Sequence, residues 1–229
     1  MGRQVCFELA RQGASVAFTY FRNEEAAKML RVEIEAVAAR RLDLADSAAI
    51  GRELKAMADE LGGVDVLVHA ASVGSTCDPA KFDQIEDVTP QGWERMMAVN
   101  ITSPFLACQT LTNRFEDEGG NVVFLGSIDG VKSVPAPVPY ATSKGALGAM
   151  VKSLAKALGQ RRIRVNLVAA GVLEAGASRT LPVALRAEYL KHCGLQRVGR
   201  VDELANVVSF FALSNTYVTG QTIIVDGGL

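Results

Sequence analysis

The feature that most constrains this chain is an alternation between short apolar runs and longer segments in which apolar residues recur every three or four positions. Strands of a parallel sheet that are buried on both faces appear in a sequence as short, continuous apolar runs. The longer segments have the periodicity of helices that cover a face of such a sheet. The alternation therefore predicts an α/β fold with a doubly wound parallel sheet and three α/β/α layers.

The predicted strands are rich in Val, Ile, Leu or Phe and comprise Ser15–Tyr20, Ala38–Leu42, Asp65–His69, Asn121–Leu125, Arg164–Ala169 and Thr222–Val225. The predicted helices are Gly2–Gln12, Glu24–Glu35, Ser47–Leu61, Thr89–Met97, Ile101–Phe115, Tyr140–Leu158 and Asp202–Leu213. Ser47 and Asp202 are predicted N-caps, because their side chains can accept hydrogen bonds from free backbone N–H groups. Ligands of a doubly wound sheet bind beyond the carboxyl ends of the strands, so functional residues are expected directly after strands.

The size and charge of the chain narrow the class of partner. With 229 residues, 49% of them hydrophobic, and no repeat or Pro-rich linker, residues 1–229 are expected to form a single domain. The 24 basic residues nearly balance the 25 acidic ones, and the net charge of -1 gives no broad field for holding nucleic acid or an anionic membrane. We therefore expect a small-molecule partner, with no nucleic acid and no membrane.

Cysteine spacing and the absence of targeting patterns indicate the compartment. Cys6, Cys77, Cys108 and Cys193 lie far apart without the paired spacing of metal ligands, so we expect free thiols, no disulfide and no metal. No apolar run approaches the ~18 residues of a membrane span, and the first residues lack the layout of a signal peptide. A cytoplasmic protein is expected.

Tyr140 and Lys144 are the first candidates for acid/base chemistry. They stand four positions apart at the start of a predicted helix, which places both side chains on one face. A phenol with a pKa of ~10 needs ~4 kcal/mol of preferential phenolate stabilisation to move down ~3 units, and a nearby ammonium can supply much of it. The spacing also arises by chance, so its meaning depends on its surroundings.

Ser127 provides that context. It precedes Tyr140 by thirteen positions and directly follows the apolar run NVVFLG, so its hydroxyl should emerge at the carboxyl end of a buried strand. There it could donate a hydrogen bond to a substrate carbonyl. Taken singly, Ser127 reads equally as a turn serine, Lys144 as a solvated helix residue and Asn100 as a helix cap.

Together, these residues resemble the short-chain dehydrogenase/reductase family, and the resemblance covers nearly the whole chain. It rests on GRQVCFELARQGASVAFTY from Gly2, DLAD at Asp43–Asp46, MMAVNITSPF around Asn100, GSIDG around Ser127, YATSKGAL from Tyr140, IRVNLVAAG ending at Gly171 and TGQTIIVDGG ending at Gly228. The resemblance implies a Rossmann-like fold. It also implies that Tyr140 is the general acid/base, Ser127 orients the carbonyl, Lys144 holds the nicotinamide ribose and acidifies Tyr140, and Asn100 supports a water relay.

The cofactor signature is incomplete. Family members begin with a strand and a Thr-Gly-x-x-x-Gly-x-Gly turn that cradles the pyrophosphate, and only Gly2 and Arg3 match the end of that turn. In the family this strand lies in the middle of the sheet, so a chain without it should have an apolar gap there. We expect that the 229 residues begin inside a longer unit, rather than working in this form, and that they bind NADPH poorly until a strand and turn precede Gly2.

The remaining cofactor contacts are inferred from the resemblance. They are Gly2, Arg3, Arg22, Asp43, Leu44, Ala71, Tyr140, Lys144 and Gly171. Arg22 follows the strand that ends at Tyr20, where a carboxylate would favour NAD and an arginine can bind a 2′-phosphate, so NADP is favoured over NAD. His69 stands where the family commonly has Asn, and we interpret it as a hydrogen-bonded strand-end histidine rather than a catalytic one.

Within the family the chain is most similar to bacterial reductases of the 3-oxoacyl-carrier-protein type. This implies NADPH-dependent reduction of a carbonyl, with a 3-oxoacyl thioester as candidate substrate, in a homodimer or homotetramer. Two alternatives stay open: reduction of an enoyl thioester, and a catalytically silent binding or assembly subunit. The segment from Leu173 to Cys193 is expected to face the substrate.

Overall fold

The computed structural model describes residues 1–74, 83–176, 178 and 181–229, and it contains the predicted parallel sheet. Its strands are β1 (Ala17–Tyr20), β2 (Ala38–Arg41), β3 (Val66–His69), β4 (Gly120–Ser127), β5 (Ile163–Ala170) and β6 (Thr222–Val225). Each pairs in parallel with its neighbour. All of these strands coincide with predicted ones to within a few residues. The doubly wound α/β class is confirmed.

The helices are α1 (Gly2–Arg11), α2 (Glu24–Glu33), α3 (Ser47–Leu61), α4 (Pro90–Met97), α5 (Ser103–Leu111), α6 (Val138–Leu158), α7 (Val183–His192) and α8 (Val201–Ser209). The predicted helix Ile101–Phe115 is divided, because a π-helical turn at Ala98–Thr102 precedes α5 and a 3₁₀ turn follows it. A second π-helical turn, Phe210–Ser214, ends α8. Helix α7 was not predicted. None of the helices in the described residues is long and apolar enough to cross a bilayer.

Both predicted N-caps are wrong by one or two residues. Ser47 is already the first residue of α3, and the cap is Asp46, whose Oδ1 accepts a hydrogen bond from the Ala49 N–H at 3.0 Å. Asp202 likewise lies inside α8, and Arg200 occupies the cap position. There the Glu203 carboxylate accepts a hydrogen bond from the Arg200 N–H at 2.8 Å, which satisfies a free donor at the helix start.

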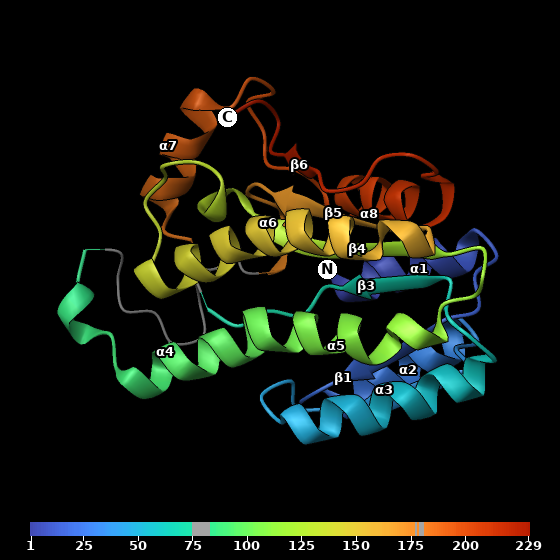
Figure 1. Ribbon diagram of the computed structural model, residues 1–229. Coiled ribbons are helices and arrows are strands. Elements are labelled where there is room, and N and C mark those ends of the chain that lie inside the picture. The colour runs from blue at the N-terminus through green and yellow to red at the C-terminus, as the bar shows by residue number, and fades with distance from the viewer. Residues whose placement is uncertain (75–82, 177, 179–180) are drawn as a thin grey trace.

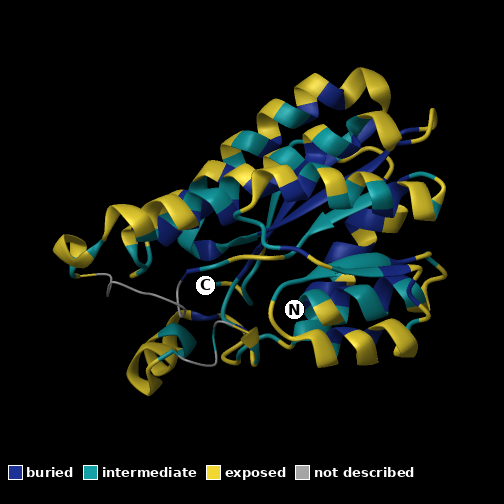
Figure 2. Ribbon diagram, turned by 90° about the horizontal axis from the view of Figure 1, so that it is seen from below, coloured by how far each residue is buried: buried dark blue, intermediate teal, exposed yellow. Residues whose placement is uncertain are grey.

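Helices cover both faces of the central strands (Figure 1), and alternating side chains of these strands supply two cores. Val122 and Phe124 of β4 pack with α5 and α6 on one face, and Val123 and Leu125 pack with α1 and α8 on the other. All four of these side chains are at most 5% exposed. Figure 2 shows the same layering, with buried strands inside and exposed residues on the outer faces of the helices.

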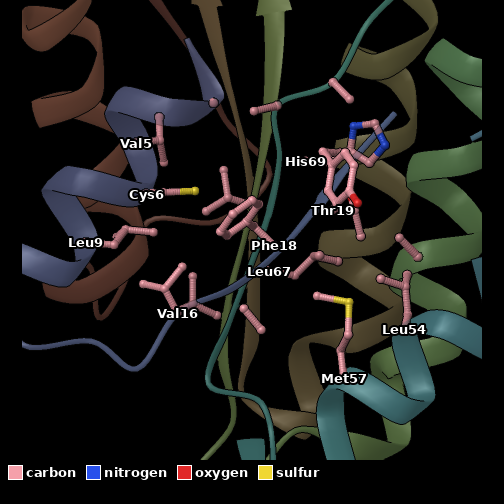
Figure 3. A pocket seen from close by; sticks show the side chains of 18 of the residues that line it. Val5, Cys6, Leu9, Val16, Phe18, Thr19, Leu54, Met57, Leu67 and His69 are labelled. Carbon is pink, nitrogen blue, oxygen red and sulfur yellow. The ribbon is translucent and has the colours of Figure 1, made fainter. Parts of the chain in front are cut away.

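The sheet is divided into two parts. β1 and β2 form one part, β3 to β6 form the other, and no strand of the described residues pairs with the facing edges of β1 and β3. An apolar cavity of about 480 Å³ lies between these edges, between α1 and α3 (Figure 3). Val5, Cys6 and Leu9 line it from α1, and Leu54 and Met57 line it from α3. The predicted apolar gap in the middle of the sheet is thus confirmed.

The gap is also where the strand order reverses. On one side of the gap the chain forms β1 and then β2, which lies farther from the gap. It then crosses to the other side, where β3, β4, β5 and β6 follow in order away from the gap. In open α/β sheets a crevice for ligands forms at such a reversal, outside the carboxyl ends of the strands. The fold therefore directs the search for a site to the ends of β1, β3 and β4.

Candidate active site

Three elements bring the predicted catalytic side chains to one edge of the sheet. Ser127 is the last residue of β4, and Tyr140 and Lys144 lie one turn apart near the start of α6, which packs across β4 and β5. Asn100 lies in the π-helical turn ahead of α5. Single π turns are frequent at functional sites, where they displace a side chain from its ordinary helical direction. The structure thus gathers residues that are up to 44 positions apart in the sequence.

Asn100 ties a loop to α6. Its Oδ1 accepts a hydrogen bond from the Val73 N–H at 2.9 Å, and its Nδ2 donates to the Val73 carbonyl at 2.8 Å and to the Ser143 Oγ at 3.0 Å. The side chain is 1% exposed, so an unpaired amide would be costly there. These bonds hold the segment after β3 against the helix that carries Tyr140.

Tyr140 and Lys144 are both buried, and burial sets their protonation. The Lys144 Nζ lies 5.6 Å from the centre of the Tyr140 ring and donates to the Leu125 carbonyl at 3.2 Å. Burial, with the Asp129 carboxyl adding to it, raises the pKa of Tyr140 to about 12. Burial lowers the pKa of Lys144 to about 8. This differs from the prediction that Lys144 acidifies Tyr140, because desolvation is the largest influence on the pKa of each group and favours the neutral phenol and the neutral amine.

Asp129 is a member of the site that the sequence analysis missed. The Ser127 hydroxyl donates to the Asp129 Oδ2 at 2.7 Å, and the Asp129 N–H lies 3.4 Å from the Ser127 Oγ. Burial raises the pKa of the Asp129 carboxyl, although Ser127 and Lys144 both oppose the rise. The signal was present in GSIDG, since a carboxylate two positions after a candidate catalytic serine is within reach of its hydroxyl.

His69 is hydrogen-bonded, which agrees with its interpretation from the sequence as a hydrogen-bonded histidine at the end of a strand. Its Nε2 lies 2.8 Å from the Ser103 Oγ, and that hydroxyl donates to the Val99 carbonyl at 2.8 Å. Ser103 has one proton to give, so His69 must be the donor in their bond. Burial, and then the charge of Lys144, lowers the pKa of His69 to about 4, which keeps the ring neutral at pH 7.

Four of the predicted cofactor-binding residues lie at the cavity between β1 and β3. Gly2 and Arg3, predicted at the pyrophosphate, line it together with Leu44 and Ala71, and Gly2 is the first residue of α1. A helix N-terminus offers free N–H groups to an anion. The Arg3 guanidinium, however, is turned to Glu33 on α2, with 2.7 Å between Nη2 and Oε2.

Arg22 is one of several cations around the end of β1. Its guanidinium lies 5.4 Å from the centre of the Phe21 ring, and that of Arg95 lies 6.0 Å from the same ring. The Arg41 Nε donates to the Phe21 carbonyl at 3.2 Å. Arg41 and Arg95 were not predicted, because they reach this point from β2 and α4 only through the fold.

Asp43 and Gly171 also follow strands. The Asp43 Oδ1 accepts from the Ala45 N–H at 3.0 Å and lies 3.5 Å from the Arg95 Nη2, so this carboxylate shapes the turn after β2. Gly171 follows β5, where a Cβ atom would come within 2.7 Å of Asp226 and of the Tyr189 hydroxyl. A side chain at position 171 would therefore force neighbouring backbone or side chains to move.

Comparison with known proteins decides the family. The family model described as Enoyl-(Acyl carrier protein) reductase matches residues 1–229. The 3-oxoacyl-[acyl-carrier-protein] reductase FabG of Staphylococcus epidermidis is 30% identical over 235 residues, which cover 100% of this chain and 94% of the relative. The chain belongs to the short-chain dehydrogenase/reductase family. It is therefore similar in sequence, along its whole length, to oxidoreductases.

Solved structures of this family have the same fold. A blue fluorescent protein from a metagenomic library, in complex with NADPH, is 31% identical with a TM-score of 0.89, covering 99% of this chain and 92% of that one. A short chain dehydrogenase from Burkholderia cenocepacia J2315, in complex with NADP, is 27% identical with a TM-score of 0.88 and the same coverage. The Rossmann-like assignment is thus confirmed by sequence and by structure.

Proposed function

We propose that this short-chain dehydrogenase/reductase reduces a carbonyl to an alcohol at the expense of NADPH. The observation that carries the proposal is the meeting of Ser127, Tyr140 and Lys144 at the carboxyl end of β4. A hydroxyl donor, a buried phenol and a buried ammonium are the groups needed to polarise a carbonyl and protonate its oxygen.

Each residue has a separate task in the proposed reaction. Tyr140, held protonated by its raised pKa, donates its phenolic proton to the carbonyl oxygen. The Lys144 ammonium stabilises the phenolate that remains. Ser127 orients the carbonyl, and Asn100 holds the loop after β3 in place through its bonds to Val73.

The residues present fit a nicotinamide dinucleotide with a 2′-phosphate. The N–H groups at the start of α1, with Arg3 beside them, suit the pyrophosphate. The guanidinium groups of Arg22, Arg41 and Arg95 gather at Phe21, where a 2′-phosphate would need cations. A bound nicotinamide supplies the hydride. Asp43, Leu44, Ala71 and Gly171 would contact the cofactor, with Lys144 on the nicotinamide ribose. The complexes of similar proteins with NADPH and NADP support this choice over NAD.

A 3-oxoacyl thioester is the candidate substrate, by similarity to the reductase from Staphylococcus epidermidis. The description of the matching family model favours an enoyl thioester instead. Reduction at carbon–carbon double bonds does not require a hydroxyl to orient a ketone. The position of Ser127 beside Tyr140 therefore supports the carbonyl reaction as the first choice and leaves the enoyl reaction as the second.

A catalytically silent binding subunit is the remaining alternative, and the gap between β1 and β3 favours it. The gap adjoins the predicted pyrophosphate site, so a loosely held β1 would weaken cofactor binding. Calorimetric titration of NADPH distinguishes an enzyme from a silent binding subunit. Binding at micromolar concentrations supports an enzyme, and no binding up to millimolar NADPH supports the silent subunit.

The direct test is NADPH consumption with acetoacetyl-CoA and, in parallel, with crotonyl-CoA. The proposal predicts oxidation of NADPH with the first and at least a tenfold lower kcat/KM with the second. Ser127→Ala should lower kcat for the ketone, while the exposed Ser153→Ala on α6 serves as the matched control. Turnover of crotonyl-CoA alone would replace the carbonyl reaction with the enoyl one.

A further inference from the structure

The carboxyl of Asp129 uses the only proton that Ser127 can donate. A serine hydroxyl has one donor hydrogen, and that hydrogen points to the Asp129 Oδ2 at 2.7 Å. To orient a substrate carbonyl as proposed above, the Ser127 hydroxyl has to turn this hydrogen from Asp129 to the carbonyl oxygen, which leaves the Asp129 Oδ2 without its donor. A substrate that binds beside Ser127 therefore has to meet the Asp129 carboxyl as well.

Asp129 is held in place by the turn that carries it. The turn Ile128–Gly130 is capped by Ser127, and it packs so closely on α6 that a Cβ atom at Gly130 would come within 2.3 Å of the Lys144 carbonyl carbon. Asp129 cannot retreat far from Ser127 without moving this contact. The backbone at Asp129 is therefore held beside Ser127.

The other oxygen of this carboxyl is free to bind a ligand. Within the part of the chain that the structure describes, Oδ1 of Asp129 makes no hydrogen bond, and Asp129 is half-buried. An ionised carboxylate offers about four acceptor positions, so the bond to Ser127 leaves most of them open. A half-buried acceptor with open positions gains from any donor that a ligand brings.

We propose that Asp129 forms a substrate subsite that binds a hydroxyl group on a carbon next to the reacting carbonyl. This inference rests on the proposed function, and it narrows the substrate class to hydroxy ketones, including 3-oxoacyl thioesters with a hydroxyl at carbon 2 or carbon 4. The substrate hydroxyl donates to the Asp129 Oδ1, and its carbonyl oxygen faces the Tyr140 phenol.

The charges in the site favour a donor at this place. A carboxylate near a carbonyl oxygen that is gaining negative charge raises the barrier to reduction unless a hydrogen-bond donor offsets it. The Asp129 carboxyl raises the pKa of both Tyr140 and Lys144, and burial raises the pKa of the Asp129 carboxyl itself. A hydroxyl on the substrate would donate a hydrogen bond to this desolvated carboxyl, and that bond would offset part of the free-energy cost of burying it.

The test compares two ketones that differ in one hydroxyl, 1-hydroxybutan-2-one and butan-2-one. Ligand-observed NMR titrations of the full chain, with and without NADP⁺, give the ratio of their dissociation constants. A bond to a charged acceptor predicts a preference for the hydroxy ketone of about tenfold to a hundredfold. Asp129→Ala should reduce the ratio to below about twofold, and the milder Asp129→Asn should give an intermediate ratio.

The matched control is Asp117→Asn, an exposed carboxylate ahead of β4, which should leave the preference unchanged. Equal binding of the two ketones to the unaltered chain, no binding of the hydroxy ketone, or an unchanged preference in a folded Asp129→Ala variant would each overturn the subsite. The same preference without NADPH oxidation would retain the subsite and reject the proposed reduction, so the two failures are distinguishable.

Discussion

Tyr140 is the side chain on which the proposed chemistry depends, and its surroundings favour the protonated phenol. Burial and the neighbouring Asp129 carboxyl raise its pKa to about 12, while the hydroxyl groups of Ser127 and Ser72 act in the opposite direction. A phenol in this state can give a proton to a carbonyl oxygen, provided that a cation stabilises the phenolate. Lys144 is placed to do so from the next turn of α6.

Replacing Tyr140 with Phe tests the proton donor directly. The ring is retained and only the hydroxyl is lost, so the thermal midpoint should change little. The value of kcat for ketone reduction should fall by ~10²-fold or more, which is the usual contribution of a general acid. Steady-state kinetics and circular dichroism give the two readouts. A variant that keeps more than about a tenth of kcat would show that another group protonates the substrate.

The pKa of Lys144 predicts how the rate of reduction depends on pH. Because burial lowers the pKa of Lys144 to about 8, the ammonium is present below this pH and is lost as the pH rises through it. Tyr140, with a pKa of about 12, stays protonated over the same range. The kcat/KM for reduction should therefore decline above pH 8. Lys144→Met should lower the rate and remove this decline, and Lys152→Met, an exposed position on α6, should do neither.

Where a helix begins depends on local hydrogen bonds that the periodicity of its apolar residues does not reveal. Ser47 and Asp46 are both good capping residues, and the apolar pattern of α3 does not choose between them. The extended backbone of Asp46, with φ of -90° and ψ of 93°, lets its side chain turn back onto the helix. The π turn at Asn100 is set by its bonds to Val73 and Ser143, which are 27 and 43 positions away.

The cap of α3 can be checked with two single substitutions. Asp46→Ala removes the acceptor for the Ala49 N–H and should lower the free energy of unfolding by ~1 kcal/mol. Ser47→Ala should change it by less than ~0.5 kcal/mol, because the capping bond is made by its neighbour. Urea unfolding of both variants gives the comparison. The reverse order of effects would mean that Ser47 is the cap after all.

The gap between β1 and β3 makes a further prediction. An apolar strand and a Gly-rich turn joined ahead of Gly2 should fill the cavity, pair with both strand edges and position α1 for an anion. We expect the midpoint of thermal unfolding to rise by at least ~2–4 °C, the equivalent of ~1 kcal/mol, and NADPH affinity to rise by about a hundredfold. An added Gly/Ser segment of equal length is the control. Equal gains from both additions, or none from either, would contradict strand insertion.

At the scale of the molecule, the outer faces of α5 and α6 are candidates for self-association. Phe105 is 42% exposed on α5, and Ala146 and Ala149 are exposed on α6, where small side chains permit close approach of a second copy. We propose a homodimer or homotetramer that uses this surface. Ultracentrifugation should show a dimer or larger species at micromolar concentrations, and Ala149→Arg should shift it toward monomer. Val32→Arg on α2 is the control, and a monomer at all concentrations would reject the surface.

Much of the architecture could be predicted because buried parallel strands are short apolar runs, and β3, β4, β5 and β6 have that form most clearly. The meeting of Ser127, Tyr140 and Lys144 at one edge of the sheet could be predicted from their order and spacing along the chain. Helix α7 could not, since none of its residues is buried and its apolar pattern is weak. Arg41 and Arg95 join Arg22 only once β2 and α4 are folded, and the contact between Asp129 and Ser127 depends on the turn after β4.

The proposed reaction transfers hydride to a carbonyl carbon while Tyr140 protonates the oxygen. Turnover of acetoacetyl-CoA with NADPH deuterated at the transferable position of nicotinamide C4 tests it most directly. We expect a 3-hydroxybutyryl product with deuterium on carbon 3, and no such product from Tyr140→Phe on the same timescale. NADPH that binds but yields no deuterated alcohol would rule out hydride transfer to a carbonyl, and a Tyr140→Phe variant that yields the alcohol at the same rate would rule out Tyr140 as the proton donor.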